Sequence, residues 1–200
     1  MTAVVLADRL AALPELTLYR GGHNPPPANT DAADLQLCIR EAISWVAGEP
    51  HSAQPACQCP VIGTAMLRFN DRVDDATRQL LLQPKVSGDP KTSLGVRSVG
   101  TRDDGYQTQR GYMASDFAVR IALPIWLDAS GRTDAAQRLR DLPEIVDRAT
   151  AIAARDIVRE IRNDLPDWWA WRSELRAKVH ATVLDALKNR SADAAAAAAA

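Results

Sequence analysis

Histidine and cysteine, the side chains best suited to metal binding and nucleophilic chemistry, gather in one part of this sequence. All three cysteines and two of the three histidines fall between positions 23 and 59, as His23, Cys38, His51, Cys57 and Cys59. Zinc favours about four such ligands in a tetrahedron, commonly from pairs spaced by about two to four residues. A single residue separates Cys57 from Cys59, so the zinc pattern is incomplete. The five residues are candidate metal ligands, and the alternative is that the thiols pack as small apolar groups.

A thiol nucleophile is the second chemistry that this region could support. Cys59 stands just before an expected helix start at Pro60, where the helix dipole favours a thiolate, and His51 lies nearby in the sequence. Glu49, in a loop bounded by glycine and proline, serves neither helix periodicity nor capping. Cys59, His51 and Glu49 are therefore candidate catalytic residues. In the alternative, the Glu49 carboxylate accepts hydrogen bonds from backbone amides of the loop that follows.

Three of the five tryptophans cluster near the end of the chain, at Trp168, Trp169 and Trp171. On the helix expected to begin at Asp167, positions 168 and 171 share a face, while position 169 points about 100° away from position 168. Because tryptophan is favoured at interaction hot spots, the three are candidate interaction residues. The alternative is that this helix lies in a groove with both of its sides covered.

The charge balance excludes some classes of partner. The chain has 24 basic and 25 acidic residues and a formal net charge of -1, which gives no electrostatic reason to bind nucleic acid or an anionic membrane. No apolar run approaches the roughly 20 residues of a membrane helix, and the first residues lack the basic leader of a signal peptide. Three cysteines do not suggest a disulfide framework. We expect a soluble, cytoplasmic protein that contacts neither nucleic acid nor membrane.

The elements that must position these residues are helices. Apolar residues recur at three- and four-residue steps along most of the chain, and strand-like alternation is hard to find, which predicts a mostly α fold. Helices are expected over 3–12, from a cap at Thr30 or Asp31 to Val46, from Pro60, from a cap at Asp74, over 109–127 with a break or kink at Pro124, from a capping box of Asp141 and Glu144, and from Asp167. Residues 84–108, rich in glycine and without periodicity, are expected to be irregular.

This layout predicts a compact multi-helix domain with a C-terminal appendage. We place the helical core domain at residues 1–128 and a pair of helices, forming a hairpin or extension, at 129–190. The alanine-rich tail at 191–200 carries no packing information, and we expect it to be disordered or to stand for unassigned residues.

A series of short motifs resembles a family of uncharacterised bacterial and phage-borne proteins that is common in actinobacteria. The motifs are "GGH" ending at His23, "CIREA" from Cys38, "AGEPHS" from Ala47, "PACQCPVIG" from Pro55, "FND" from Phe69, "VGTR" from Val99 and "DFAVR" from Asp116. They cover about half of the chain in the family's order. Phe69 replaces the family's tryptophan, and "VSGDPKTSLGVRS" is longer than the usual connection. The resemblance implies an origin in a phage or other mobile element, and it implies no activity.

Two functions follow from these observations. The first is a non-enzymatic interaction or assembly protein, whose partner is another protein or a second copy of itself and which needs no cofactor. The alternative is a small metal- or thiol-dependent enzyme, with zinc as the metal. It would be centred on residues 23–59 and would use Cys38, Glu41, His51, Cys57 and Cys59.

Overall fold

The computed structural model describes residues 5–164 of the chain. Within this range the backbone is mostly helical, and the only strand pairings are isolated β-bridges, so the predicted fold class is confirmed. Contacts divide the chain into two compact units, Met1–Gly111 and Tyr112–Ala200, whereas the sequence placed the division at residue 128. None of the helices within residues 5–164 has the length and apolarity to cross a membrane.

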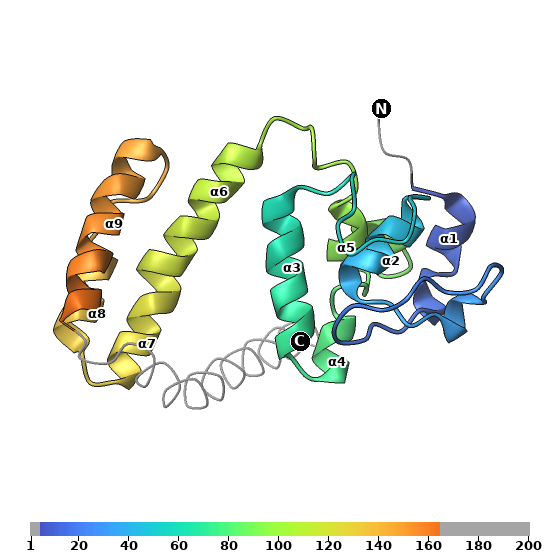
Figure 1. Ribbon diagram of the computed structural model, residues 1–200, viewed down its shortest axis with the longest axis horizontal. Helices are drawn as coiled ribbons and strands as arrows, with labels where there is room; N and C mark the ends of the chain where they lie inside the picture. The colour runs from blue at the N-terminus through green and yellow to red at the C-terminus, as the bar shows by residue number, and fades with distance from the viewer. Residues whose placement is uncertain (1–4, 165–200) are drawn as a thin grey trace. The chain divides into compact units, whose positions relative to one another are not determined.

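The first unit is built around one short helix, most of whose residues are buried. Its elements are α1 (Ala7–Ala11), η1 (Leu13–Glu15), η2 (Ala32–Asp34), α2 (Ile39–Val46), α3 (Pro60–Arg72), α4 (Asp75–Gln79), η3 (Pro90–Thr92) and α5 (Leu94–Arg97). Figure 1 shows α2 lying between α1 and α3. The apolar side chains of α2 are buried, and α1, α3 and α5 pack against this helix. Helix α2 is therefore the centre of the first hydrophobic core.

Helix α2 begins later than the sequence predicts. Thr30 and Asp31 do not start a long helix, because Asp31 precedes only the single turn η2 and the chain is extended again at Leu35. Leu35 and Leu37 are both buried, and Leu37 forms a parallel bridge with Leu18. Leu35 and Leu37 lie on an extended segment, and the apolar residues that follow lie on α2. Because both segments pack into the same core, their apolar residues together give the spacing of a single helix face.

Two other helices of this unit, α3 and α4, begin where the sequence predicts. Helix α3 begins at Pro60, as predicted, and Asp74 caps α4 by accepting a hydrogen bond of 2.8 Å from the Thr77 amide.

The segment 84–108, predicted to be irregular, instead contains η3 and α5. The residue that marks the start of α5 is Ser93, whose hydroxyl accepts a hydrogen bond from the Val96 amide and so caps this short helix.

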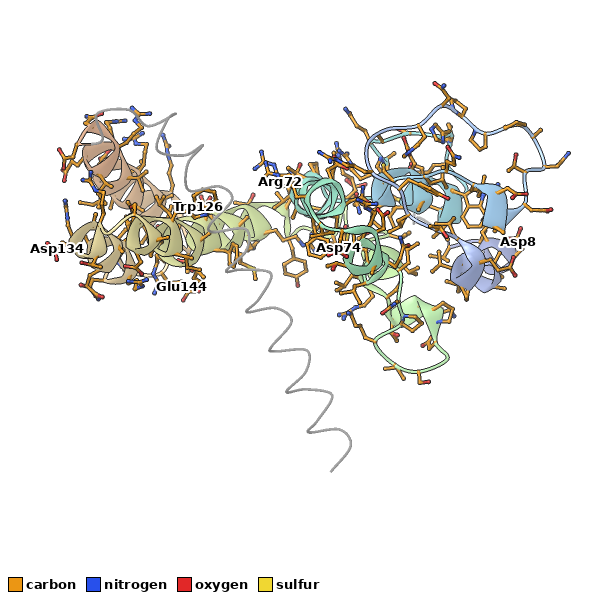
Figure 2. The ribbon with its side chains drawn as sticks, turned by 90° about the horizontal axis from the view of Figure 1, so that it is seen from below. Asp8, Arg72, Asp74, Trp126, Asp134 and Glu144 are labelled. Carbon is orange, nitrogen blue, oxygen red and sulfur yellow. The ribbon has the colours of Figure 1, made fainter. Side chains whose placement is uncertain are left out.

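The second unit begins within α6 (Gln107–Asp116), which continues through the π-helical η4 (Phe117–Ala122) into α7 (Leu123–Ala129). Helices α8 (Thr133–Arg140) and α9 (Arg148–Asn163) complete its described part. Figure 1 shows α6 and α7 as one continuous helical segment, and Figure 2 shows the side chains, with Trp126 on α7, Asp134 on α8 and Glu144 in the connection to α9. The core contains Leu127, Ala136, Leu139 and Ile161.

Pro124 does not end the helix that contains it. Proline has no N–H to donate to the carbonyl four residues earlier, and its ring clashes with that carbonyl in a regular α-helix. The chain avoids both problems with the wider π-helical turn η4, which directly precedes α7. The predicted break or kink is therefore a local change of helix type.

The start of α9 corrects a second sequence prediction. Asp141 and Glu144 do not form a capping box, because Asp141 ends α8, a helix that the sequence analysis missed. Asp147 caps α9 instead, accepting a hydrogen bond of 2.8 Å from the Thr150 amide. The intervening segment is not helical, and its Ile145 side chain is buried. The helix predicted from Asp167, the three clustered tryptophans and the alanine tail lie outside the described residues.

The contact between α5 and α2 leads to a stability prediction. A Cβ atom at Gly95 would lie 3.0 Å from Cδ2 of Leu82 and 3.2 Å from Cδ1 of both Ile39 and Ile43. We expect Gly95→Val to lower the free energy of unfolding by about 1–3 kcal/mol, since overpacking shifts the core. The matched control is Gly111→Val on α6, where a Cβ meets no atom within 4 Å and the change should stay below about 0.5 kcal/mol. Urea unfolding of both variants measures the difference, and equal losses would contradict the packing argument.

Candidate functional site

The buried carboxylate of Glu41 joins three segments of the first unit. Glu41 is 2% exposed in the first turn of α2. Its Oε1 accepts a hydrogen bond of 2.8 Å from the His23 amide, and its Oε2 accepts bonds of 2.8 Å from the Cys38 amide and 2.9 Å from His23 Nδ1. His51 Nε2 lies 3.7 Å from Glu41 Oε1 and donates to the His23 carbonyl at 2.9 Å. The loop at His23, the start of α2 and the loop at His51 therefore meet at one carboxylate.

The sequence fixes this position through helix capping. Cys38 is the N-cap of α2 and Glu41 is the third residue of the helix, so the two form a capping box in which cysteine replaces the usual serine or threonine. The four letters "CIRE" therefore mark the helix start. The same carboxylate that completes the box also binds the backbone and the ring of His23.

The hydrogen bonds keep Glu41 ionised in spite of its burial. Burial raises the pKa of this carboxyl, but the amides of His23 and Cys38 and the ring of His23 outweigh that effect and hold the pKa below its usual range. Hydrogen bonds to an ionised acceptor are about twice as strong as those between neutral groups. The charge is thus an attachment point for the two loops.

Two of the three thiols, those of Cys38 and Cys57, are held in their protonated form. Burial, together with the nearby Glu41 carboxylate, raises the pKa of Cys38 to about 11. Burial, with the Glu49 carboxylate beside it, raises the pKa of Cys57 to about 12. Cys59 is fully buried, and its amide donates to the Thr101 hydroxyl at 3.0 Å. A protonated thiol is a poor nucleophile, so Cys38 and Cys57 are poorly suited to nucleophilic catalysis at neutral pH.

Glu49 holds the loop that carries Cys57 and Cys59 by hydrogen bonds to its backbone. Its carboxylate accepts hydrogen bonds of 2.7 Å from the amides of both Ala56 and Cys57. The interpretation of Glu49 as a ligand of loop amides is confirmed. Glu49 was a candidate catalytic residue, and its carboxylate is already hydrogen-bonded to these two backbone amides.

The predicted metal ligands gather only in part. The structure brings His23 and His51 together with Glu41, which the sequence analysis included in the alternative enzyme but not among the five candidate metal ligands. Across residues 5–164, no group of three or more histidine, cysteine or acidic side chains is arranged to hold a metal ion. The zinc site stays a prediction from the sequence.

Sequence reasoning missed Asn70 of the "FND" motif, whose side chain also connects the loop before His23 to α2 by hydrogen bonds. This buried side chain donates to the Tyr19 carbonyl at 2.9 Å, and its Oδ1 accepts from the Ile39 amide at 3.3 Å. The adjacent Asp71 accepts a hydrogen bond of 3.0 Å from the Gly21 amide. The loop that Glu41 holds at His23 is thus also held just before it, and the motif itself was the available signal.

Two cavities flank the proline-rich loop that follows His23. One, of about 450 Å³, is lined by His23, the prolines and the side chains of Thr30, Asp34 and Gln36. The other, of about 420 Å³, lies by Arg9 and Trp45 on the other side of Pro26 and Pro27. Both are open to solvent, and both polar and apolar groups line them.

A row of exposed apolar side chains on the second unit forms a separate candidate site. Met113, Phe117 and Ile121 are 69%, 58% and 49% exposed, and α6 buries none of its residues. We call these three side chains the apolar ridge. It lies on the continuous helix formed by α6, η4 and α7 (Figure 1).

Comparisons of this chain with protein-family models, with curated proteins and with solved structures find no match. The family resemblance of the motifs therefore stays a prediction.

The ionised state of Glu41 makes stability depend on pH. We expect Glu41→Gln to lower the free energy of unfolding by about 2–3 kcal/mol at pH 7, since the amide cannot reproduce the charge-assisted bonds. The folded pKa is depressed, so this contribution is full above the unfolded value of 4.5 and is lost as the pH falls below it. Urea unfolding at pH 7 and pH 3.5 should show the difference from wild type shrinking at the lower pH. A difference that is the same at both values would contradict an ionised Glu41.

Burial and the raised pKa values predict inert cysteines. At pH 7.5 we expect none of the three thiols to react with Ellman's reagent in the folded protein, and all three to react in 8 M urea. The folded-state rate should be at least about 100-fold slower than the unfolded rate, because reaction requires local opening. Rapid release of one equivalent from the folded protein would identify an accessible thiolate and restore the nucleophile hypothesis.

Proposed function

We propose that this protein is a non-enzymatic interaction or assembly protein, and that the apolar ridge is its contact surface. The observation that carries the proposal is the exposure of Met113, Phe117 and Ile121 in one row. Single exposed apolar residues are ordinary, whereas a contiguous row of large ones is typical of a surface that another protein covers.

The helix that bears the ridge supports this proposal. Its N-terminal part, α6, buries no side chain against the rest of the described structure, so its exposed face does not serve the core. The C-terminal part is different, because Leu127 on α7 is completely buried against α8 and α9. One end of the continuous helix is thus fixed to the second core while the ridge faces solvent.

The chemistry-bearing residues of the first unit also support it. Glu41 and Glu49 bind loop amides, and burial keeps Cys38 and Cys57 protonated. These groups stabilise the fold through hydrogen bonds and packing, which weakens the case for the alternative metal- or thiol-dependent enzyme. The origin in a phage or mobile element, taken from the family resemblance, fits a protein that acts on a host protein or assembles with its own copies.

A ridge substitution tests the proposal in the cells that produce the protein. We expect affinity capture of the tagged wild-type chain to retain a protein at near-stoichiometric amount, and Phe117→Glu to reduce its recovery at least about 10-fold, because the charge would be buried in the contact. The matched control is Val146→Glu, an equally exposed apolar residue (57%) of the same unit that lies in the connection between α8 and α9 and is not part of the ridge. Circular dichroism checks that both variants are folded. Identical capture by wild type and Phe117→Glu would overturn the proposal.

A further inference from the structure

The ring of His23 is held in place at a cavity wall with one nitrogen left over. The Glu41 carboxylate accepts hydrogen bonds from the His23 amide at 2.8 Å and from His23 Nδ1 at 2.9 Å. His51 Nε2 donates to the His23 carbonyl at 2.9 Å, so the amide, the carbonyl and the ring are all fixed. Within residues 5–164, His23 Nε2 makes no hydrogen bond, and the ring lines the cavity of about 450 Å³ beside the proline-rich loop.

The partner of Nδ1 decides the chemistry of Nε2. An ionised carboxylate can only accept, so His23 Nδ1 must carry the proton of its hydrogen bond to Glu41. In the neutral imidazole, the other nitrogen is then an acceptor with a free lone pair. Glu41 therefore gives the cavity a fixed acceptor, which needs no rearrangement to meet a donor on a ligand.

The other side chains of the cavity wall also offer mainly acceptors. Asp34 contributes a carboxylate, and the Thr30 hydroxyl donates its proton to the Pro27 carbonyl at 2.8 Å, which leaves only lone pairs for a ligand. The three successive prolines of the wall have no N–H to donate. Among the lining side chains, only the amides of Asn24 and Gln36 can donate, and each also carries an acceptor oxygen. A complementary ligand must supply N–H donors and a positive charge.

We propose that this cavity binds a small primary alkylammonium ion. The ammonium group brings three N–H donors and one positive charge, for which the wall offers His23 Nε2, the Thr30 hydroxyl and the Asp34 carboxylate. The proline rings offer apolar surface to the methylene groups. The inference goes beyond the proposed function, because it concerns the first unit and does not involve the apolar ridge.

A bare metal ion and an anion fit this wall less well. Within residues 5–164, no group of three or more histidine, cysteine or acidic side chains is arranged to hold a metal ion. The cavity also has the volume of a small-molecule site, which is far more than one ion fills. An anion would meet the Asp34 carboxylate and a wall poor in donors.

Titration of the purified full chain with n-butylammonium chloride tests the inference. The amine stays protonated at pH 8, since its pKa is close to that of lysine, about 10.4. We expect the side-chain nitrogens of His23, followed by ¹⁵N NMR, to shift and saturate with a dissociation constant of about 1–5 mM, the range open to so small a ligand. The matched neutral probe is 1-butanol, which should give no saturable shift. No saturation up to about 50 mM amine, or equal binding of butanol, would overturn the inference.

Two aspartates of the same loop give a matched pair of variants. Asp31 and Asp34 are both exposed and flank or end η2, but Asp31 lines the other cavity. We expect Asp34→Asn to raise the dissociation constant about 5-fold, the effect of losing one solvent-accessible charge pair, and Asp31→Asn to leave it unchanged. Both variants remove the same net charge. Equal weakening by both would indicate attraction to the negative surface in general and would overturn the site.

The proton on the free His23 ring supplies a separate test. At pH 8 we expect the ¹⁵N shifts to identify Nδ1 as the protonated nitrogen and Nε2 as the bare one, because Glu41 accepts at Nδ1. Nε2 should then be the nitrogen that shifts more when the amine is added. A proton on Nε2 in the free protein would remove the acceptor and overturn the inference. None of these measurements depends on Phe117, so this inference and the proposed function fail separately.

Discussion

A buried negative charge is the constraint on which the first unit depends. A carboxylate removed from water costs several kcal/mol unless donors surround it, and Glu41 finds them in the His23 amide, the His23 ring and the Cys38 amide. Two of these donors come from a loop 18 positions earlier in the chain. The charge is tolerated only while that loop is in place, so the position of the loop and the start of α2 are determined together.

The motifs of the sequence describe this same network. "GGH" supplies the donors, "CIREA" the carboxylate and its cap, and "AGEPHS" contributes both His51 and Glu49. "FND" adds Asn70, which connects the Tyr19 carbonyl to the Ile39 amide. Hydrogen bonds between loops thus give the polar residues of these four motifs a structural role.

Sequence reasoning succeeded where one local interaction decides the structure. Pro60 at the start of α3 and Asp74 at the cap of α4 needed nothing beyond their own neighbours. It failed where a distant contact decided, as when the bridge between Leu18 and Leu37 kept residues before α2 extended. The same reason hid the role of Glu41, since its partner His23 is close to it only in the folded chain. The exposed face of α6 was also hidden, because periodicity shows that a helix has an apolar side without showing what covers it.

The π-helical turn η4 limits how the chain can change length. A turn of this kind is equivalent to one residue inserted into an α-helix, and here it precedes Pro124, whose ring would otherwise meet a backbone carbonyl. Removing one residue between Phe117 and Ala122 would bring that carbonyl against the proline ring and rotate every following side chain by about 100° around the helix axis. Leu127 would then turn away from the core that it fills. Replacing a residue in this segment therefore leaves the position of Leu127 unchanged, whereas an insertion or a deletion shifts it.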